Sequence, residues 1–232
     1  MTRAAFFDKI RPEFGGKLAP ETVAGIEALL DAGRDLPLQH MANVLAQVRR
    51  ETGGYMAPIK ETVMPWHKDK NPSDAEVIRR LDNAFARGQL KGVKTPYWRS
   101  GEFGRGQIQV THERNRKKFG IKNRDDLLKL SVSAQVAVDG MSKGLFTGKK
   151  LADYTFTRDL KNPVKTNPRR IVNGNDGSDA EVAASHMMFA EALALLAPRA
   201  PRADYVLTTP KAAPSFWADL VKLFAKFFLR KT

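Results

Sequence analysis

Two glutamates, Glu51 and Glu61, have the residue type and spacing that could support catalysis. Glu51 follows Val44 and Val48 at helical spacing, so its side chain projects from the apolar side of a helix near the end of that helix. A carboxyl group beside apolar neighbours loses hydration, which favours the neutral, proton-carrying form that a general acid requires. A solvated glutamate at a frayed helix end has the same spacing, so the pattern leaves both interpretations open.

Glu61 lies ten residues further along the chain, beyond Gly53 and Gly54, where the chain must reverse direction. The second carboxyl group can therefore face the first across a groove instead of sharing its helix. Inverting hydrolysis of a glycosidic bond needs two carboxyl groups about 6.5–9.5 Å apart, so that a water molecule can be seated and activated. The two glutamates are therefore candidates for acid–base cleavage of a glycosidic bond.

A polar cluster, GRGQIQVT at residues 104–111, could bind a sugar. Its glycines allow the backbone to approach a ligand closely. If residues 107–111 are extended, Gln107, Gln109 and Thr111 share one face, and the two apolar residues between them face the core. An ordinary edge strand with one polar face has the same pattern. The cluster lacks the GK[ST] ending of a phosphate-binding loop.

The elements that must position the glutamates and the polar cluster are predicted to be mostly helices. Apolar residues recur at helical spacing in five segments, 20–31, 37–51, 73–87, 132–145 and 178–197. The last of these is the most apolar and should be central to the core. Strand signals are weak, and the best of them is at 103–111. The sequence therefore predicts a mainly α fold with little strand content.

Composition limits the classes of protein and partner. The chain has 232 residues, enough for one sizeable core or for one domain with a small appendage. It has no cysteine, which excludes disulfides and thiolate metal sites, and its four histidines form no zinc-binding pair. A zinc enzyme is therefore disfavoured. A net charge of +14 predicts a polyanionic partner: nucleic acid, an anionic membrane or an anionic cell wall.

The first residues do not resemble a signal peptide, and no apolar run is long enough to span a membrane. We therefore expect a cytoplasmic protein that another component releases. A boundary is predicted near residue 200, because the segment that follows is rich in proline and shows little periodicity. The predicted units are a helical domain at 1–199, a linker at 200–214 and a basic amphipathic helix at 215–232.

Residues 215–231 have the pattern of a cationic amphipathic helix. Trp217, Phe224 and Phe227 belong to its apolar face, and Lys222, Lys226 and Arg230 recur every four residues on the other side. So many aromatic side chains on one short helix would be costly to expose, so either the main domain or a lipid surface should cover them. An anionic membrane or lipopolysaccharide would attract the basic residues.

Four ordered segments resemble glycoside hydrolase family 19, especially its phage and bacterial endolysin branch. They are FFDKIRPEFGGKLAPETVAGIEALL, HMANVLAQVRRETGGYMAPIKE, the pair RLDNAFARGQLKGVKTPYW and FGRGQIQVTHERNRKKFG, and RRIVNGNDG. The resemblance covers residues 5–195. It implies a lysozyme-like helical catalytic domain that hydrolyses β-1,4 glycosidic bonds of bacterial peptidoglycan without a cofactor.

The resemblance also implies a role for each matching residue. Glu51 would be the general acid and Glu61 the general base, and Thr111 would help to hold the attacking water. Gln109, Asn115 and Asn173 would contact the sugars, and Arg170 would support the site electrostatically. The chain departs from the family at Arg116, where a tyrosine is common, and at Gln107, where an aromatic residue is common.

Three alternatives remain beside a peptidoglycan-cleaving endolysin that acts as a monomer and passes from the host cytoplasm to the cell wall. One keeps the fold and changes the substrate to chitin, although secreted chitinases usually carry a signal peptide and often disulfides. Another is a membrane-disrupting protein whose catalytic site is secondary. Nucleic-acid binding is the weakest, because no binding module is present and the aromatic residues follow a helical stripe.

Overall fold

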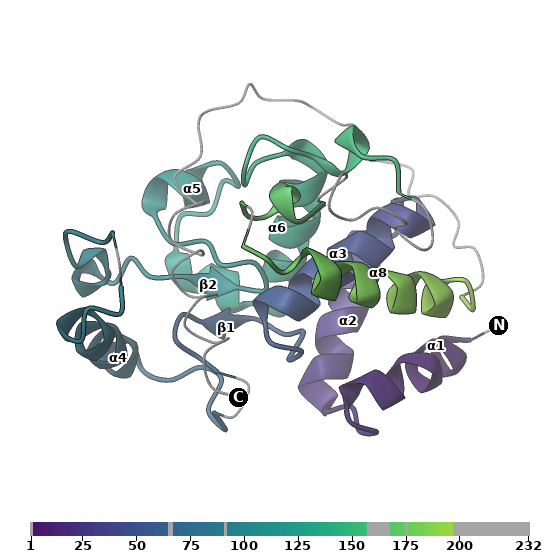
Figure 1. Ribbon diagram of the computed structural model, residues 1–232, viewed down its shortest axis with the longest axis horizontal. Helices are drawn as coiled ribbons and strands as arrows, with labels where there is room; N and C mark the ends of the chain where they lie inside the picture. Colours follow the sequence, from purple (N-terminus) through teal and green to yellow (C-terminus); the bar gives the residue numbers. More distant parts are fainter. Residues whose placement is uncertain (1, 65–66, 91, 157–167, 175, 197–232) are drawn as a thin grey trace.

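A computed structural model describes residues 2–64, 67–90, 92–156, 168–174 and 176–196. The protein is mainly helical, as predicted (Figure 1). The predicted linker at 200–214 and the predicted amphipathic helix at 215–232 lie outside the described residues. Within the described residues we find no helix with the length and apolar character of a membrane span.

All five predicted helices are confirmed. The longer helices are α1 (Arg3–Ile10), α2 (Pro20–Ala32), α3 (Leu38–Glu51), α4 (Asp74–Ala86), α6 (Leu130–Lys143) and α8 (Asp179–Leu193). The shorter helical elements are α5 (Glu113–Lys117) and the 3-10 helices η1 (Arg11–Phe14), η2 (Tyr97–Ser100), η3 (Arg124–Leu128), η4 (Leu151–Asp153) and η5 (Pro168–Ile171).

Local side-chain chemistry determines where several helices begin. The Ser73 hydroxyl accepts a hydrogen bond from the backbone N–H of Glu76 at the start of α4, and Pro20 occupies the first turn of α2.

The main core surrounds α3, which packs against α8, while α2 packs against α6. The apolar residues of α3 that the pattern singled out, among them Val44, Leu45 and Val48, are fully buried. Phe189 and its neighbours place α8 in the same core, as predicted. The last turn of α3 therefore rests on a rigid support, and this turn carries Glu51.

A second, smaller core lies under α4. It consists of Val77, Leu81, Leu90, Trp98 and Phe103. We call this part, residues 67–90 and 92–103, the α4 lobe. In Figure 1 it lies at the opposite end of the molecule from α1, and the small sheet lies between them.

The sheet has two short antiparallel strands, β1 (Ile59–Lys60) and β2 (Arg105–Gly106). Ile59 pairs with Gly106, and Lys60 pairs with Arg105. Within the weak strand signal at 103–111, only residues 105–106 form a strand; residues 107–109 form a turn that brings Val110 back to Arg105, so the condition that residues 107–111 are extended is not met. Gly106 permits this reversal with a φ of 111°, a conformation that side-chain-bearing residues rarely adopt.

Candidate active site

Glu51 ends α3 with a side chain that is only 8% exposed. Its Oε1 accepts a hydrogen bond of 2.5 Å from Nη2 of Arg169, a fully buried residue of η5. Its Oε2 accepts no hydrogen bond from the described residues. The helical pattern predicted apolar neighbours for Glu51; the structure adds a charged partner and leaves one carboxyl oxygen available.

Arg169 is shared between two carboxyl groups. Its Nε and Nη2 donate to Oδ2 of Asp176 at 3.0 and 2.9 Å, and its Nη1 donates to Oε1 of Gln47 at 3.0 Å. Burial alone would raise the pKa of Asp176, but the charge of Arg169 and hydrogen bonds from Arg169 and Ser178 lower this pKa to about 2. Asp176 therefore stays ionised and balances the charge of Arg169, so this arginine has a second anionic partner besides Glu51.

Asn173 belongs to this cluster, whereas the side chain of Arg170 does not. The Nδ2 of Asn173 donates to Oδ2 of Asp176 at 3.0 Å, so this amide orients the carboxylate behind Glu51. Arg170 was predicted to support the site, but its side chain is exposed, and the arginine that contacts Glu51 is Arg169. The two adjacent residues of η5 point in different directions, so a shift of one position exchanges a buried arginine for a solvated one.

Glu61 follows β1 directly and is also almost fully buried. Its Oε2 accepts a hydrogen bond of 2.7 Å from the backbone N–H of Gly104, and its Oε1 accepts one of 3.0 Å from the Tyr97 hydroxyl. Its own backbone N–H donates to the carbonyl oxygen of Gly104 at 2.8 Å. Burial raises the pKa of Glu61, and the Gly104 bond, the Tyr97 bond and the charge of Arg105 act in the opposite direction. The result is a carboxylate that is more basic than an exposed glutamate.

Tyr97 is a site residue that sequence reasoning missed. It begins η2, and its ring packs edge-on against Trp98 and His112, with centroids 5.1 and 5.3 Å away. Burial and the neighbouring Glu61 raise the pKa of Tyr97, so its hydroxyl group remains a proton-bearing donor. The sequence feature that could have pointed to Tyr97 is the adjacent aromatic pair Tyr97–Trp98 within a long, loop-like segment.

Left-handed backbone conformations occur beside Glu61. Thr62 has a φ of 68° and Met56 a φ of 64°, values that are unusual for residues other than glycine and most of all for a β-branched one. The hydroxyl of Thr62 is buried and has no hydrogen-bond partner among the described residues. Such local strain clusters at functional sites and persists only where the surroundings hold it.

The chain between the two glutamates is tightly fixed. The Thr52 hydroxyl donates to the carbonyl of Val48 at 2.7 Å and accepts from the backbone N–H of Met56 at 2.9 Å. A Cβ atom on Gly25 of α2 would lie 2.3 Å from the carbonyl oxygen of Met56, so only glycine allows this loop to approach the helix. The reversal predicted after Gly53 and Gly54 is therefore present and rigid.

The polar residues predicted to bind sugar are buried or form hydrogen bonds to the backbone of neighbouring loops. Gln107 is fully buried and donates to the carbonyl of Met56, so it supports the loop and presents no amide to a ligand. Gln109 donates to the carbonyls of Ile59 and Gly106 at 3.3 and 3.0 Å and so ties the turn to β1. Thr111 and Asn115 are both buried. Gln107 Oε1, Gln109 Oε1 and Asn115 Nδ2 are buried and have no hydrogen-bond partner among the described residues.

No group of three or more His, Asp or Glu side chains within the described ranges is arranged to hold a metal ion. No family model, curated protein or solved structure matches this chain. The chemistry of the site therefore follows from its own geometry. That geometry consists of two buried glutamates, one beside a shared arginine and one held by neutral donors.

Proposed function

We propose that the protein hydrolyses β-1,4 glycosidic bonds of bacterial peptidoglycan, with Glu51 as general acid and Glu61 as general base. The observation that carries this proposal is the contrast between the two buried carboxyl groups. Glu51 keeps one oxygen available for a proton, whereas both oxygens of Glu61 are held by donors that do not neutralise its charge. Two carboxyl groups in different environments suit the two roles of inverting glycoside hydrolysis.

Glu51 would act on the leaving group. A proton on its Oε2 passes to the oxygen that links two sugars, and the bond from this oxygen to the anomeric carbon breaks. The carboxylate that forms on Glu51 is stabilised by Arg169, which donates to Oε1 and retains Asp176 as its second partner. Arg169 therefore favours the carboxylate that remains after the proton has left.

Glu61 would act on the water. It accepts a proton from a water molecule while the water oxygen bonds to the anomeric carbon from the opposite face of the ring. The pKa of Glu61, raised by burial, makes it a stronger base than an exposed glutamate at the same pH. Exchange with solvent returns the proton to Glu51 and removes the one on Glu61, and the cycle closes.

The proposed substrate follows from charge and from the resemblance. A chain with a net charge of +14 is attracted to an anionic cell wall more than to neutral chitin. As the resemblance implies, Thr111 is proposed to serve the water, and Gln109, Asn115 and Asn173 are proposed to contact the sugars. Residues 215–231 are proposed to bind an anionic membrane or lipopolysaccharide.

Mass spectrometry of the products released from purified peptidoglycan tests this proposal. New reducing ends on N-acetylmuramic acid would identify a muramidase, and new ends on N-acetylglucosamine a glucosaminidase. Glu51→Gln should lower the rate by about 10²–10⁴-fold, the contribution of a general acid. Glu113→Gln, which removes an exposed glutamate of α5, should leave the rate unchanged. Free amines without new reducing ends, or faster release from chitin than from peptidoglycan, would contradict the proposal.

A further inference from the structure

Asp74, the first residue of α4, bridges the two strands of the sheet. Its Oδ1 accepts a hydrogen bond of 2.8 Å from Nζ of Lys60 on β1, and its Oδ2 accepts one of 2.8 Å from Nη2 of Arg105 on β2. Lys60 and Arg105 are direct partners in the strand pairing. Two like charges opposite one another destabilise a strand pair, so the carboxylate between them compensates both.

The bridge is adjacent to the proposed general base. Glu61 comes directly after Lys60, the last residue of β1, and Gly104 comes directly before Arg105, the first residue of β2. Gly104 exchanges two hydrogen bonds with Glu61, one through its backbone N–H to the carboxylate and one through its carbonyl oxygen. Asp74 therefore holds the side chains of Lys60 and Arg105, which are the sequence neighbours of Glu61 and of Gly104.

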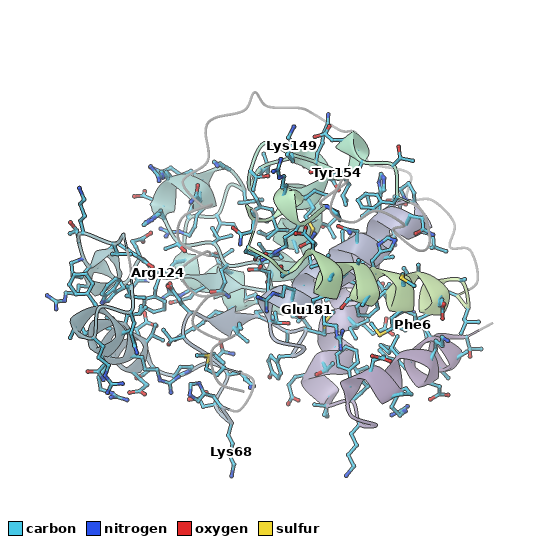
Figure 2. All side chains as sticks on the ribbon, viewed as in Figure 1. Phe6, Lys68, Arg124, Lys149, Tyr154 and Glu181 are labelled. Atoms are coloured by element: carbon cyan, nitrogen blue, oxygen red, sulfur yellow. The ribbon has the colours of Figure 1, made fainter. Side chains whose placement is uncertain are left out.

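Arg105 transmits this restraint because its guanidinium is fixed on every side. It is 1% exposed, donates to the carbonyls of Gly101 and Phe103 and to Asp125, and stacks over the Phe103 ring at 3.9 Å. Arg124, labelled in Figure 2 beside the α4 lobe, lies 3.6 Å from the same Asp74 carboxylate. Burial would raise the pKa of Asp74, but Lys60, Arg105 and Arg124 lower it, so this carboxylate stays ionised.

We propose that Asp74 is a positioning residue for Glu61, acting through Lys60 and Arg105 to hold the Gly104 N–H against the Glu61 carboxylate. This role rests on the proposed function, because positioning matters most if Glu61 activates a water. The groups that act on Glu61 from the surrounding elements are Tyr97 of η2, Gly104 and Arg105. Asp74 itself touches neither substrate nor water in this scheme.

The test compares Asp74→Asn with Glu76→Gln in the full-length protein. Both variants remove one acidic residue from the first turn of α4, but Glu76 forms its ion pairs with Arg79 and Arg80 of the same helix and none, among the described residues, with the sheet. Two properties are measured: kcat and KM on purified peptidoglycan, and the titration of Glu61 by NMR with carboxyl-labelled glutamate. Asp74→Asn should lower kcat about tenfold with little change in KM, as a displaced catalytic group does. Glu76→Gln should change neither property.

The direction of the Glu61 titration separates positioning from simple electrostatics. Removal of a negative charge would lower the pKa of Glu61, whereas a weakened Gly104 hydrogen bond raises it. An upward shift in Asp74→Asn is therefore the expected result. Asp74→Glu, which keeps the charge and displaces the carboxylate by one methylene, should give the same upward shift, and it serves alone if Asp74→Asn does not fold.

A folded variant with the kcat and the Glu61 titration of the parent, or with a downward shift, would overturn the proposal. The NMR titration needs no substrate, so it distinguishes the two hypotheses. A parent protein that cleaves no glycan would refute the proposed function. The titration of Glu61 in the Asp74 variants would still decide whether Asp74 positions this carboxylate.

Discussion

The two candidate catalytic glutamates are both buried, but the protein stabilises them in different ways. Glu51 faces a full positive charge, supplied by Arg169 and shared with Asp176. Glu61 faces a hydroxyl and a backbone N–H, and the cation whose charge acts on it, Arg105, is committed to Asp74 and Asp125. A charged partner compensates the charge that the carboxylate carries after proton release. The neutral donors of Glu61 fix its orientation and lower its pKa by less than burial raises it.

The residues that contact the two glutamates also differ in how far they lie from them along the sequence. The Glu51 cluster joins the end of α3 to η5, across 118 residues of sequence, through one buried arginine. The Glu61 cluster joins two short strands and η2 within a span of about fifty residues, through several weaker contacts. The loss of one residue should therefore damage the first cluster more than the second.

The largest expected effect is on stability and comes from Arg169. Arg169→Met should lower the free energy of unfolding by about 3–5 kcal/mol, the cost of leaving a buried charge without its partner. The reason is that Asp176 and Glu51 lose the cation between them. Arg170→Met is the matched control, because the neighbouring side chain is exposed, and its effect should lie within about 0.5 kcal/mol of zero. Urea denaturation at neutral pH measures both. Similar effects for the two variants would mean that Arg169 does not hold the cluster together.

This pair of arginines also shows what the sequence could and could not predict. The helices were predictable because apolar periodicity is local, and the same pattern placed Glu51 at the end of α3. The partners of the glutamates were not predictable, because Arg169, Tyr97 and Asp74 reach them only after the chain has folded. Nothing in the local sequence distinguishes Arg169 from Arg170, since both belong to the same short turn.

The segment after β2 differs from the extended alternative for another reason. Alternation of polar and apolar residues favoured an extended segment with Gln107 facing a ligand. The backbone at Gly106 turns instead, and the Gln107 amide is used inside the protein against the loop at Met56. A glycine that can adopt either sign of φ makes a periodicity of two unreliable over so short a segment.

The next expected effect tests the neutral donors of Glu61. Tyr97→Phe removes a hydroxyl that stabilises the ionised carboxylate, so the pKa of Glu61 should rise further. Because the base must be ionised, activity on peptidoglycan should then fall at a higher pH than in the parent as the solution is acidified. The loss of kcat/KM at neutral pH should be about tenfold to a hundredfold, because one hydrogen bond to a charged group contributes about 1.5–3 kcal/mol.

Tyr154→Phe is the control for this experiment, because Tyr154 lies near Arg170 and makes no contact with Glu61. Its pH profile should coincide with that of the parent. An acidic limb that moves to lower pH in Tyr97→Phe would show that the hydroxyl does not act as a donor to the ionised carboxylate.

The smallest expected effect is a pH-dependent difference in stability between the parent and Glu61→Gln. Burial raises the pKa of Glu61 in the folded state above the ordinary value of 4.5. The stabilising contribution of this group is therefore fully present below the unfolded pKa and is lost as the pH rises through the folded pKa. Glutamine stays neutral, so Glu61→Gln should gain stability relative to the parent as the pH increases from about 4 to about 8, measured as Tm at each pH.

Glu113→Gln is the control. Its Tm relative to the parent should change with pH in the opposite direction, because hydrogen bonding to Lys117 lowers the pKa of Glu113. The amide of Gln at position 61 meets the Gly104 N–H with a different geometry, but this adds an offset that does not vary with pH. A Tm difference that stays constant across the range would mean that Glu61 titrates like an exposed glutamate, and the contrast between the two carboxyl groups would disappear.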